Sequence, residues 1–222
     1  MRCIMSNTEE REFLNVVEKV LKKEQISLSK LCISREGCSY FDNSGLATRR
    51  MENALVYLIC KKLLDEKGFF YKWSLAWEDN YPRKTKQHCD ITMTRHKPSP
   101  GKDRGDLTKN PGPWHFIEFG YYSDGALQKY ARRLKELEDQ KPRKEVDSFK
   151  CGGRYIVMFR VVSEGEARQL EKAPIRNNYL NDGDRKKWVL KRSEDIRKVS
   201  LDKENGVFVI EFFKLAKHRG AS

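Results

Sequence analysis

The sequence predicts an α/β domain in which helices flank a mixed central β-sheet, with a helical appendage at the N-terminus. Three observations lead to this class. Amphipathic helix patterns and strand-like runs alternate in the order helix, strand, strand, strand, helix, strand. Residues 155–159 are apolar throughout, which is typical of a central strand covered on both faces. A chain of 222 residues has room for one sizeable domain and a small appendage.

The N-terminal part of the chain is expected to be helical. Residues 8–23 place apolar side chains at helical spacing, with acidic residues early and lysines late, as the helix dipole favours. Residues 27–31 predict the start of a second short helix, and 33–46 predict a loop. We therefore assign residues 1–45 to the appendage and 46–222 to the main domain. A helix-turn-helix is the alternative, but the short second pattern favours a helical cap or a dimer contact.

The main domain is expected to alternate helices with strands. Its second helix turns Leu127, Tyr130, Ala131 and Leu134 inward. A long basic loop, rich in proline and glycine, is expected over 95–113. The predicted helices span 48–67, 124–139 and 164–172, and the predicted strands span 69–77, 88–93, 114–119, 154–162 and 207–213. The polar stretch 173–205 predicts no element.

The charge balance favours a polyanionic partner. Lysines and arginines number 45 against 32 acidic residues, which gives a formal net charge of +13. No apolar run reaches membrane-spanning length, and the first ten residues lack an apolar signal core. We therefore expect no membrane partner and a cytoplasmic location, or a nuclear one in a eukaryote. The six cysteines are widely spaced and form no C-x-x-C pair, so reduced thiols are expected rather than a zinc site.

Two acidic residues stand inside strand-like runs, Asp90 in 88–93 and Glu118 in 114–119. A buried carboxylate is unfavourable unless a metal ion or another cation pairs with it. On successive strands of one hairpin, the two carboxylates could hold a single divalent ion. In so basic a chain, this indicates a metal-dependent enzyme that acts on nucleic acid. Taken alone, Glu118 also fits a strand carboxylate that is paired with an arginine, and Asp90 also fits a carboxylate beside a turn.

With this element order, the chain resembles the PD-(D/E)xK nuclease superfamily, which includes the restriction endonucleases. The resemblance spans residues 48–162 and covers Glu52 in Arg-Met-Glu-Asn-Ala-Leu, Asp90 in His-Cys-Asp-Ile-Thr and Glu118 in Phe-Ile-Glu-Phe-Gly. It implies a restriction-endonuclease-like core and hydrolysis of DNA phosphodiester bonds by a site-specific endonuclease. It also implies that Asp90 and Glu118 bind Mg²⁺ (or Mn²⁺), with Glu52 in support. Such enzymes commonly work as homodimers, and the helix at 8–23 could supply the contact.

The chain departs from the family pattern at two positions. Gly120 stands where the motif places a lysine, and Cys89 stands where it places a proline. Lys129, on the following helix, is the candidate to replace the missing lysine, although a surface lysine is the commoner role for such a residue. His115 and Gln128 are weaker candidates. A site without its lysine also fits a nucleic-acid-binding protein with a degenerate nuclease fold.

Basic residues on the long loop and on the helix after it are expected to bind the phosphates of a nucleic-acid backbone. Such contacts would make binding salt-dependent. The sequence does not distinguish DNA from RNA. A basic scaffold protein, whose positive charge serves an acidic protein partner or RNA, is a further alternative. The expected nucleic-acid-binding residues are Lys97, Lys102, Arg104, Lys109, Arg132 and Arg133.

Overall fold

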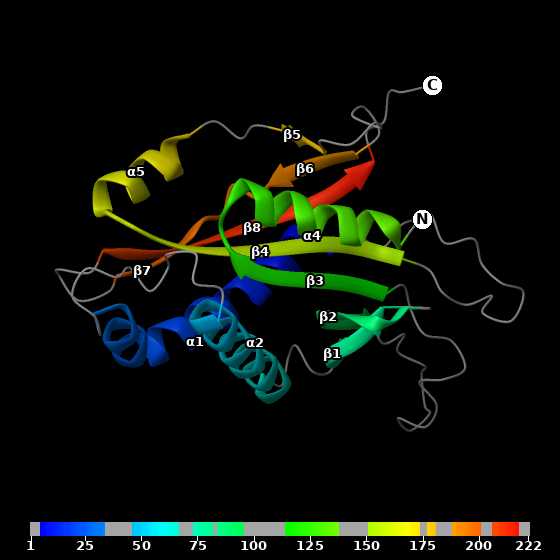
Figure 1. Cartoon of the computed structure of the whole chain (residues 1–222), viewed down its shortest axis with the longest axis horizontal. Helices are drawn as coiled ribbons and strands as arrows, with labels where there is room; N and C mark the ends of the chain where they lie inside the picture. The colour runs from blue at the N-terminus through cyan, green and yellow to red at the C-terminus, as the bar shows by residue number, and fades with distance from the viewer. Residues whose placement is uncertain are drawn as a thin grey trace, which may run out of the picture.

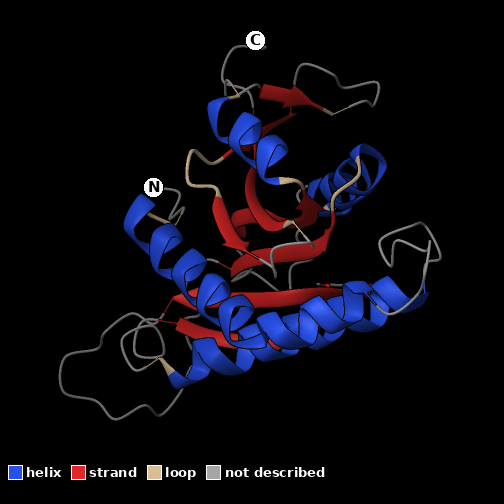
Figure 2. Ribbon diagram, turned by 90° about the vertical axis from the view of Figure 1, so that its left-hand side faces the viewer, coloured by secondary structure: helices blue, strands red, loops and turns tan. Residues whose placement is uncertain are grey.

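A mixed β-sheet runs through the centre of the protein, with helices on both of its faces (Figures 1 and 2). The predicted α/β class, with a mixed sheet flanked by helices, is confirmed. The computed structural model describes residues 5–33, 46–66, 73–81, 84–95, 114–137, 151–173, 177–180, 188–200 and 206–217. The helices are α1 (Asn7–Ile33), α2 (Leu46–Asp65), α4 (Asp124–Glu136) and α5 (Glu164–Lys172). The strands are β1 (Trp73–Tyr81), β2 (Lys84–Arg95), β3 (Trp114–Tyr121), β4 (Cys151–Val162), β5 (Asn177–Tyr179), β6 (Trp188–Arg192), β7 (Arg197–Ser200) and β8 (Val207–Lys217).

The sheet combines antiparallel and parallel pairing. Its strands follow the order β1-β2-β3-β4-β8-β6-β5, and β7 also pairs with β8. β1, β2 and β3 are successive antiparallel neighbours, whereas β3 and β4 are parallel because α4 carries the chain back between them. The predicted order of helix, three strands, helix and strand is confirmed as α2, β1, β2, β3, α4 and β4.

Apolar cores lie between the sheet and the helices on each face. On one face, Leu21 of α1 and Ile59 of α2 share a core with Phe119 of β3. On the other face, Leu127 of α4 packs with Ile156 of β4. Residues 155–159 are all buried and belong alternately to the two cores, so the predicted central strand is confirmed. Full burial of each such side chain stabilises the fold by about 1.5–3 kcal/mol. None of the described helices is long and apolar enough to cross a membrane.

The first helix differs from the expected pattern. The prediction of a helix over 8–23 and a separate short helix from residue 27 is wrong, because α1 is one continuous helix of 27 residues. The helix-turn-helix alternative fails for the same reason. Neither glycine nor proline interrupts this segment, so the backbone has no cause to break. The sequence predicts that α1 belongs to an appendage. In the structure α1 buries Phe13, Val17 and Leu21 in the core that it shares with the sheet.

The sequence predicts no element in 173–205, and this prediction is wrong. The stretch contains β5, β6 and β7, which form an edge of the sheet. β6 has five residues and β7 has four, so neither shows a full period-two pattern. Their pairing with β8 defines them: β6 runs along Phe213–Lys217 and β7 along Val207–Ile210.

Candidate active site

The two predicted carboxylates come together where the pairing of β2 with β3 ends. The antiparallel ladder runs from Thr94 opposite Trp114 to Ile91 opposite Ile117. The ladder stops there, one residue short of Asp90 on β2 and of Glu118 on β3. There, Asp90 Oδ2 accepts a hydrogen bond of 2.7 Å from the backbone N–H of Phe119. The carboxylate of Asp90 is thus fixed against the β3 backbone beside Glu118.

Glu118 is buried on the α4 side of the sheet. Its side chain is 1% exposed, whereas Asp90 is partly buried. Ile117 and Phe119 belong to the core on the α1 and α2 side, so strand alternation turns Glu118 toward the opposite layer. An ionised carboxylate at this depth is stable only with cations or hydrogen-bond donors around it. Any ion bound by Glu118 must therefore lie between the sheet and the α4 layer.

Tyr130 of α4 fills the space next to Gly120, two residues beyond Glu118. A Cβ atom on Gly120 would stand 2.5 Å from Tyr130 Cε2 and 2.7 Å from its hydroxyl oxygen. The helix is held in this position by the buried side chains of Leu127 and Ala131 and by Ser123, whose Oγ accepts a 3.1 Å hydrogen bond from the Ala126 N–H. The inward orientation expected for Tyr130 is consistent with this contact, and its phenol occupies the position of a side chain at residue 120.

The other basic residues predicted on α4 have different environments. Lys129 and Arg132 are exposed. Arg133 is half-buried, and its guanidinium carbon lies 5.8 Å from the centre of the Tyr130 ring. Arg133, a predicted nucleic-acid contact, therefore sets a positive charge beside the Tyr130 ring.

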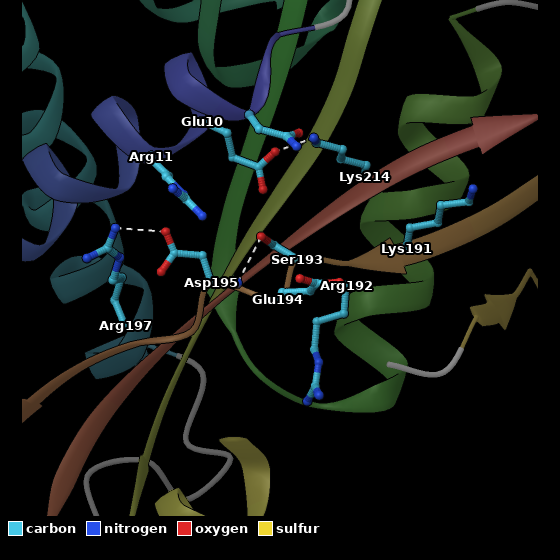
Figure 3. Close-up of a pocket in the computed structure, with 10 residues that line it drawn as sticks. Glu10, Arg11, Lys191, Arg192, Ser193, Glu194, Asp195, Arg197 and Lys214 are labelled. Carbon is cyan, nitrogen blue, oxygen red and sulfur yellow. Dashed lines mark hydrogen bonds and ion pairs between the residues drawn. The ribbon is translucent and has the colours of Figure 1, made fainter. Parts of the chain in front are cut away.

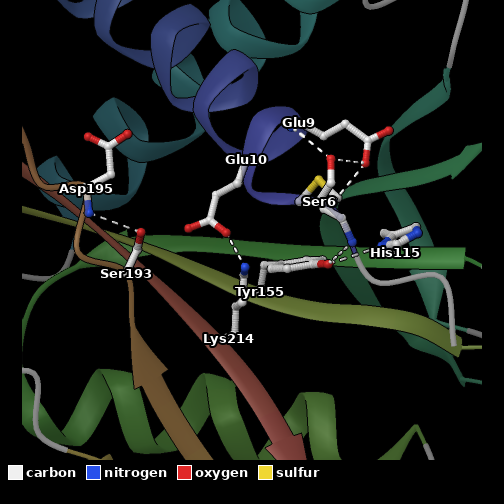
Figure 4. Close-up of polar contacts among 9 residues, drawn as sticks. Ser6, Glu9, Glu10, His115, Tyr155, Ser193, Asp195 and Lys214 are labelled. Atoms are coloured by element: carbon white, nitrogen blue, oxygen red, sulfur yellow. Dashed lines mark hydrogen bonds and ion pairs between the residues drawn. The ribbon is translucent and has the colours of Figure 1, made fainter.

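His115 belongs to the opposite face of the sheet from Glu118. Its ring is 1% exposed and stacks on Tyr155 with ring centres 5.9 Å apart, and Trp73 packs edge-on against it. The Tyr155 hydroxyl lies 3.4 Å from His115 Nδ1 and accepts a 2.9 Å hydrogen bond from the backbone N–H of Met5 (Figure 4). His115 thus helps to anchor the start of α1 and does not share the side of the sheet where Glu118 lies.

Several predicted residues lie outside what the structure describes. Glu52 is in α2, and its side chain is not among the described ones. Among the described side chains, no group of three or more histidines, cysteines or acidic residues gathers in a metal-binding arrangement. A pair of carboxylates nevertheless suits magnesium, which usually keeps several waters beside one or two protein carboxylates. Outside the described residues are Lys97, Lys102, Arg104 and Lys109.

A charged cluster, which the sequence does not reveal, lies farther along the same face of the sheet. Glu211 of β8 is 1% exposed and forms ion pairs with Arg160 of β4 and, at 3.3 Å, with Arg192 of β6. Arg192 also donates a 2.9 Å hydrogen bond to the carbonyl of Ala173, which follows α5. The Arg160 guanidinium carbon lies 4.0 Å from the centre of the Tyr122 ring. These residues come from separate strands, so no local motif marks them.

Gly120→Ala tests the contact with Tyr130. The added methyl group is expected to lower the free energy of unfolding by about 1–3 kcal/mol, because the Tyr130 ring must move. In a Tyr130→Ala background, the same substitution is expected to be nearly neutral, which a double-mutant cycle in urea would measure. Gly125→Ala is the matched control, because a Cβ atom there meets nothing within 4 Å. An equal effect of Gly120→Ala in both backgrounds would contradict the contact.

Tyr122 is expected to make the free energy of unfolding depend on pH in the alkaline range, and a Tyr122 variant can test this. Burial, then the hydrogen bond to Asp124 and the charge of Asp124, raise the pKa of Tyr122 to about 12 from an ordinary value of 10.0. The unfolded chain releases this proton first, so the stabilisation is complete below pH 10 and is lost as pH rises toward about 12. The free energy of unfolding should fall less over this range in Tyr122→Phe than in the wild type. Parallel pH profiles would disprove this assignment.

Comparison of the chain with protein-family models, curated proteins and solved structures gives no match. The candidate site therefore has to be judged on its own chemistry. It offers two hard oxygen ligands, a phenol and a nearby guanidinium. Such a set can hold a hard divalent cation and stabilise negative charge on a phosphate.

Proposed function

We propose that the protein is a magnesium-dependent endonuclease that hydrolyses DNA phosphodiester bonds. The observation that carries this proposal is the juxtaposition of Asp90 and Glu118 at the end of the β2–β3 ladder. Two carboxylates leave an ion of this kind free to bind water and a phosphate oxygen. The net charge of +13 supports a polyanionic substrate.

The topology supports a restriction-endonuclease-like core. In the proposed fold, three antiparallel strands follow a helix, and a second helix then crosses to a strand parallel to the third. The chain has this sequence of elements in α2, β1, β2, β3, α4 and β4, with the same senses of pairing. Glu52 is then proposed to support the site from α2.

Each residue at the site has a proposed role in the reaction. A bound magnesium ion would polarise the scissile phosphate and lower the pKa of a bound water. Asp90 and Glu118 would hold that ion. In the hydrolysis the water oxygen forms a bond to phosphorus, the bond from phosphorus to one sugar oxygen breaks, and this sugar oxygen takes up a proton released by the water. Tyr130 fills the space where the motif lysine would begin, so its hydroxyl is proposed to donate a hydrogen bond to the phosphate oxygen that gains charge. Lys129 is the alternative residue for this role.

The proposal is tested by incubating supercoiled plasmid with pure protein and Mg²⁺ or Mn²⁺. Nicked or linear product is expected with either metal and should disappear when EDTA is added. Plasmids that cover many sequences, and a structured RNA, should be included because the substrate sequence is unknown. The proposal fails if folded protein cuts none of these substrates and Mn²⁺ does not bind to it in a titration followed by paramagnetic resonance.

A non-catalytic nucleic-acid-binding protein is the second candidate. The Tyr130 ring at Gly120 favours it, because this ring leaves no room for the motif lysine. Such a protein would bind plasmid in a salt-sensitive way, with affinity that does not depend on Mg²⁺. Metal binding by the wild type that is lost in Asp90→Asn would instead favour the nuclease.

A further inference from the structure

A pocket of about 650 Å³ opens where α1 begins, beside the edge that β6 and β7 form against β8 (Figure 3). Residues 193–196 link the two edge strands, and 193–195 form part of the pocket wall. The lining residues include three acidic ones and five cationic ones, and the cationic ones are Arg11, Lys191, Arg192, Arg197 and Lys214. Most of the lining residues are therefore charged, and the cationic ones outnumber the acidic ones.

Three of these cations are already neutralised by carboxylates. Lys214 pairs with Glu10, Arg192 pairs with Glu211, and Arg197 pairs with Glu18 and Asp195. Among the described residues, Arg11 and Lys191 are the two lining cations that make no hydrogen bond or ion pair, and both are exposed. The carboxylate of Glu194 also makes no hydrogen bond or ion pair among the described residues. Two positive charges from different elements are thus available to a ligand.

The strand register sets two lysines against each other. Lys191 of β6 lies directly opposite Lys214 of β8. Like charges in this position repel each other across an antiparallel pair. Glu10, which is 5% exposed, compensates Lys214. A second anion in the pocket would compensate Lys191, and Figure 3 shows the Arg11 side chain extending from α1 toward the segment that links β6 and β7.

We propose that this pocket binds the phosphate group of a small molecule such as a nucleotide. A phosphate dianion matches the positive charge of these two available cations in the lining, and the arginine fork suits its oxygen atoms. The first turn of α1 borders the pocket at Asn7. The volume lies within the range of small-molecule sites.

This pocket is separate from the proposed nuclease site. Its lining comes from α1, from β6 and the segment after it, from the start of β7 and from β8. None of its lining residues belongs to β2, β3 or α4, which carry the proposed catalytic residues. Binding here can therefore be measured without metal and without any cleavage assay, and the outcome does not depend on the proposed function.

The test is isothermal titration of the full chain with AMP and with adenosine, in EDTA and at low ionic strength. AMP is expected to bind at least about tenfold more tightly than adenosine, because only AMP carries the phosphate. Arg11→Gln and Lys191→Gln are each expected to weaken AMP binding about tenfold. Glu194→Gln is expected to tighten it severalfold, since this change removes a competing negative charge. Lys23→Gln is the matched control: Lys23 is exposed on α1, outside the pocket, and should leave binding unchanged.

A short single strand with and without a 5′-phosphate distinguishes the source of the phosphate. Binding of AMP identifies a nucleotide ligand. Binding of the phosphorylated strand alone, lost in Arg11→Gln and Lys191→Gln, assigns the pocket to a strand end. The proposal is overturned if AMP and adenosine bind alike, if no phosphate compound binds, or if both pocket variants bind AMP as the wild type does. These side chains are exposed, so urea unfolding curves should show that all variants fold normally.

Discussion

Asp90→Asn and Glu118→Gln are each expected to slow Mg²⁺-dependent plasmid cleavage by at least about 100-fold. Substitution of a residue that only contacts a metal ligand typically lowers metal affinity or activity by about 10–100-fold. Asp90 and Glu118 are proposed as direct ligands, so a larger effect is expected. Both changes keep the shape of the side chain and an oxygen acceptor, so the contact of residue 90 with the Phe119 N–H can persist. The expected loss of activity is therefore caused by the missing negative charge at the ion, and the fold is retained.

Controls for this result should separate the site from general charge effects. Glu164→Gln makes the same change on an exposed residue of α5, and cleavage should be unaffected. Plasmid binding in EDTA should be equal or slightly tighter in the two site variants, because each removes a negative charge. Full cleavage activity in either Asp90→Asn or Glu118→Gln would remove that residue from the proposed mechanism.

Glu211→Ala is expected to produce the largest loss of stability. The Glu211 carboxylate is buried and pairs with Arg160 and Arg192, so its removal leaves two guanidinium groups in a largely buried place without their anion. Breaking a buried ion pair in this way costs about 3–5 kcal/mol. For a chain of this size, such a change corresponds to a fall of roughly 10 °C in the midpoint of thermal unfolding.

The nearby loop supplies the control for this experiment. Glu194→Ala removes an exposed carboxylate that forms no ion pair among the described residues, and its effect should stay within about 0.5 kcal/mol. Calorimetry would measure both variants. A small loss in Glu211→Ala would mean that the two arginines find water or other partners. Because Arg192 also lines the phosphate pocket, AMP binding should be measured in the same variant.

The order of the core elements could be predicted because each depends on local pattern. Apolar periodicity identified α2, α4 and β4, and the two carboxylate runs identified β2 and β3. The placement of Asp90 against the β3 backbone beside Glu118 could not be fixed to one residue in this way. A long connection between two strands leaves their register free, and a shift of one residue would turn a side chain to the other face.

The residues near the carboxylates differ in how well the sequence pattern predicts the positions of their side chains. On α4, Tyr130 is three residues after Leu127 and four before Leu134, so helical periodicity turns it toward the sheet. Lys129 is two residues from Leu127 and lies on another side of the helix, where it is exposed. Its choice as the replacement lysine rests on sequence proximity to the motif, whereas the contact at Gly120 depends on how α4 docks, which the sequence does not reveal.

The position of α1 has a consequence for how the chain folds during synthesis. The backbone N–H of Met5, just before α1, donates a hydrogen bond to Tyr155, which lies 150 residues later in the chain. Glu18 of α1 accepts a hydrogen bond from Arg197, which lies 179 residues later. The first helix therefore leaves the ribosome long before the strands that cover its apolar side. Contacts so distant in sequence form slowly, and nascent chains that expose apolar surface are prone to aggregate. We expect fragments that end before β7 and β8 to leave part of the apolar side of α1 exposed and to depend on chaperones for solubility.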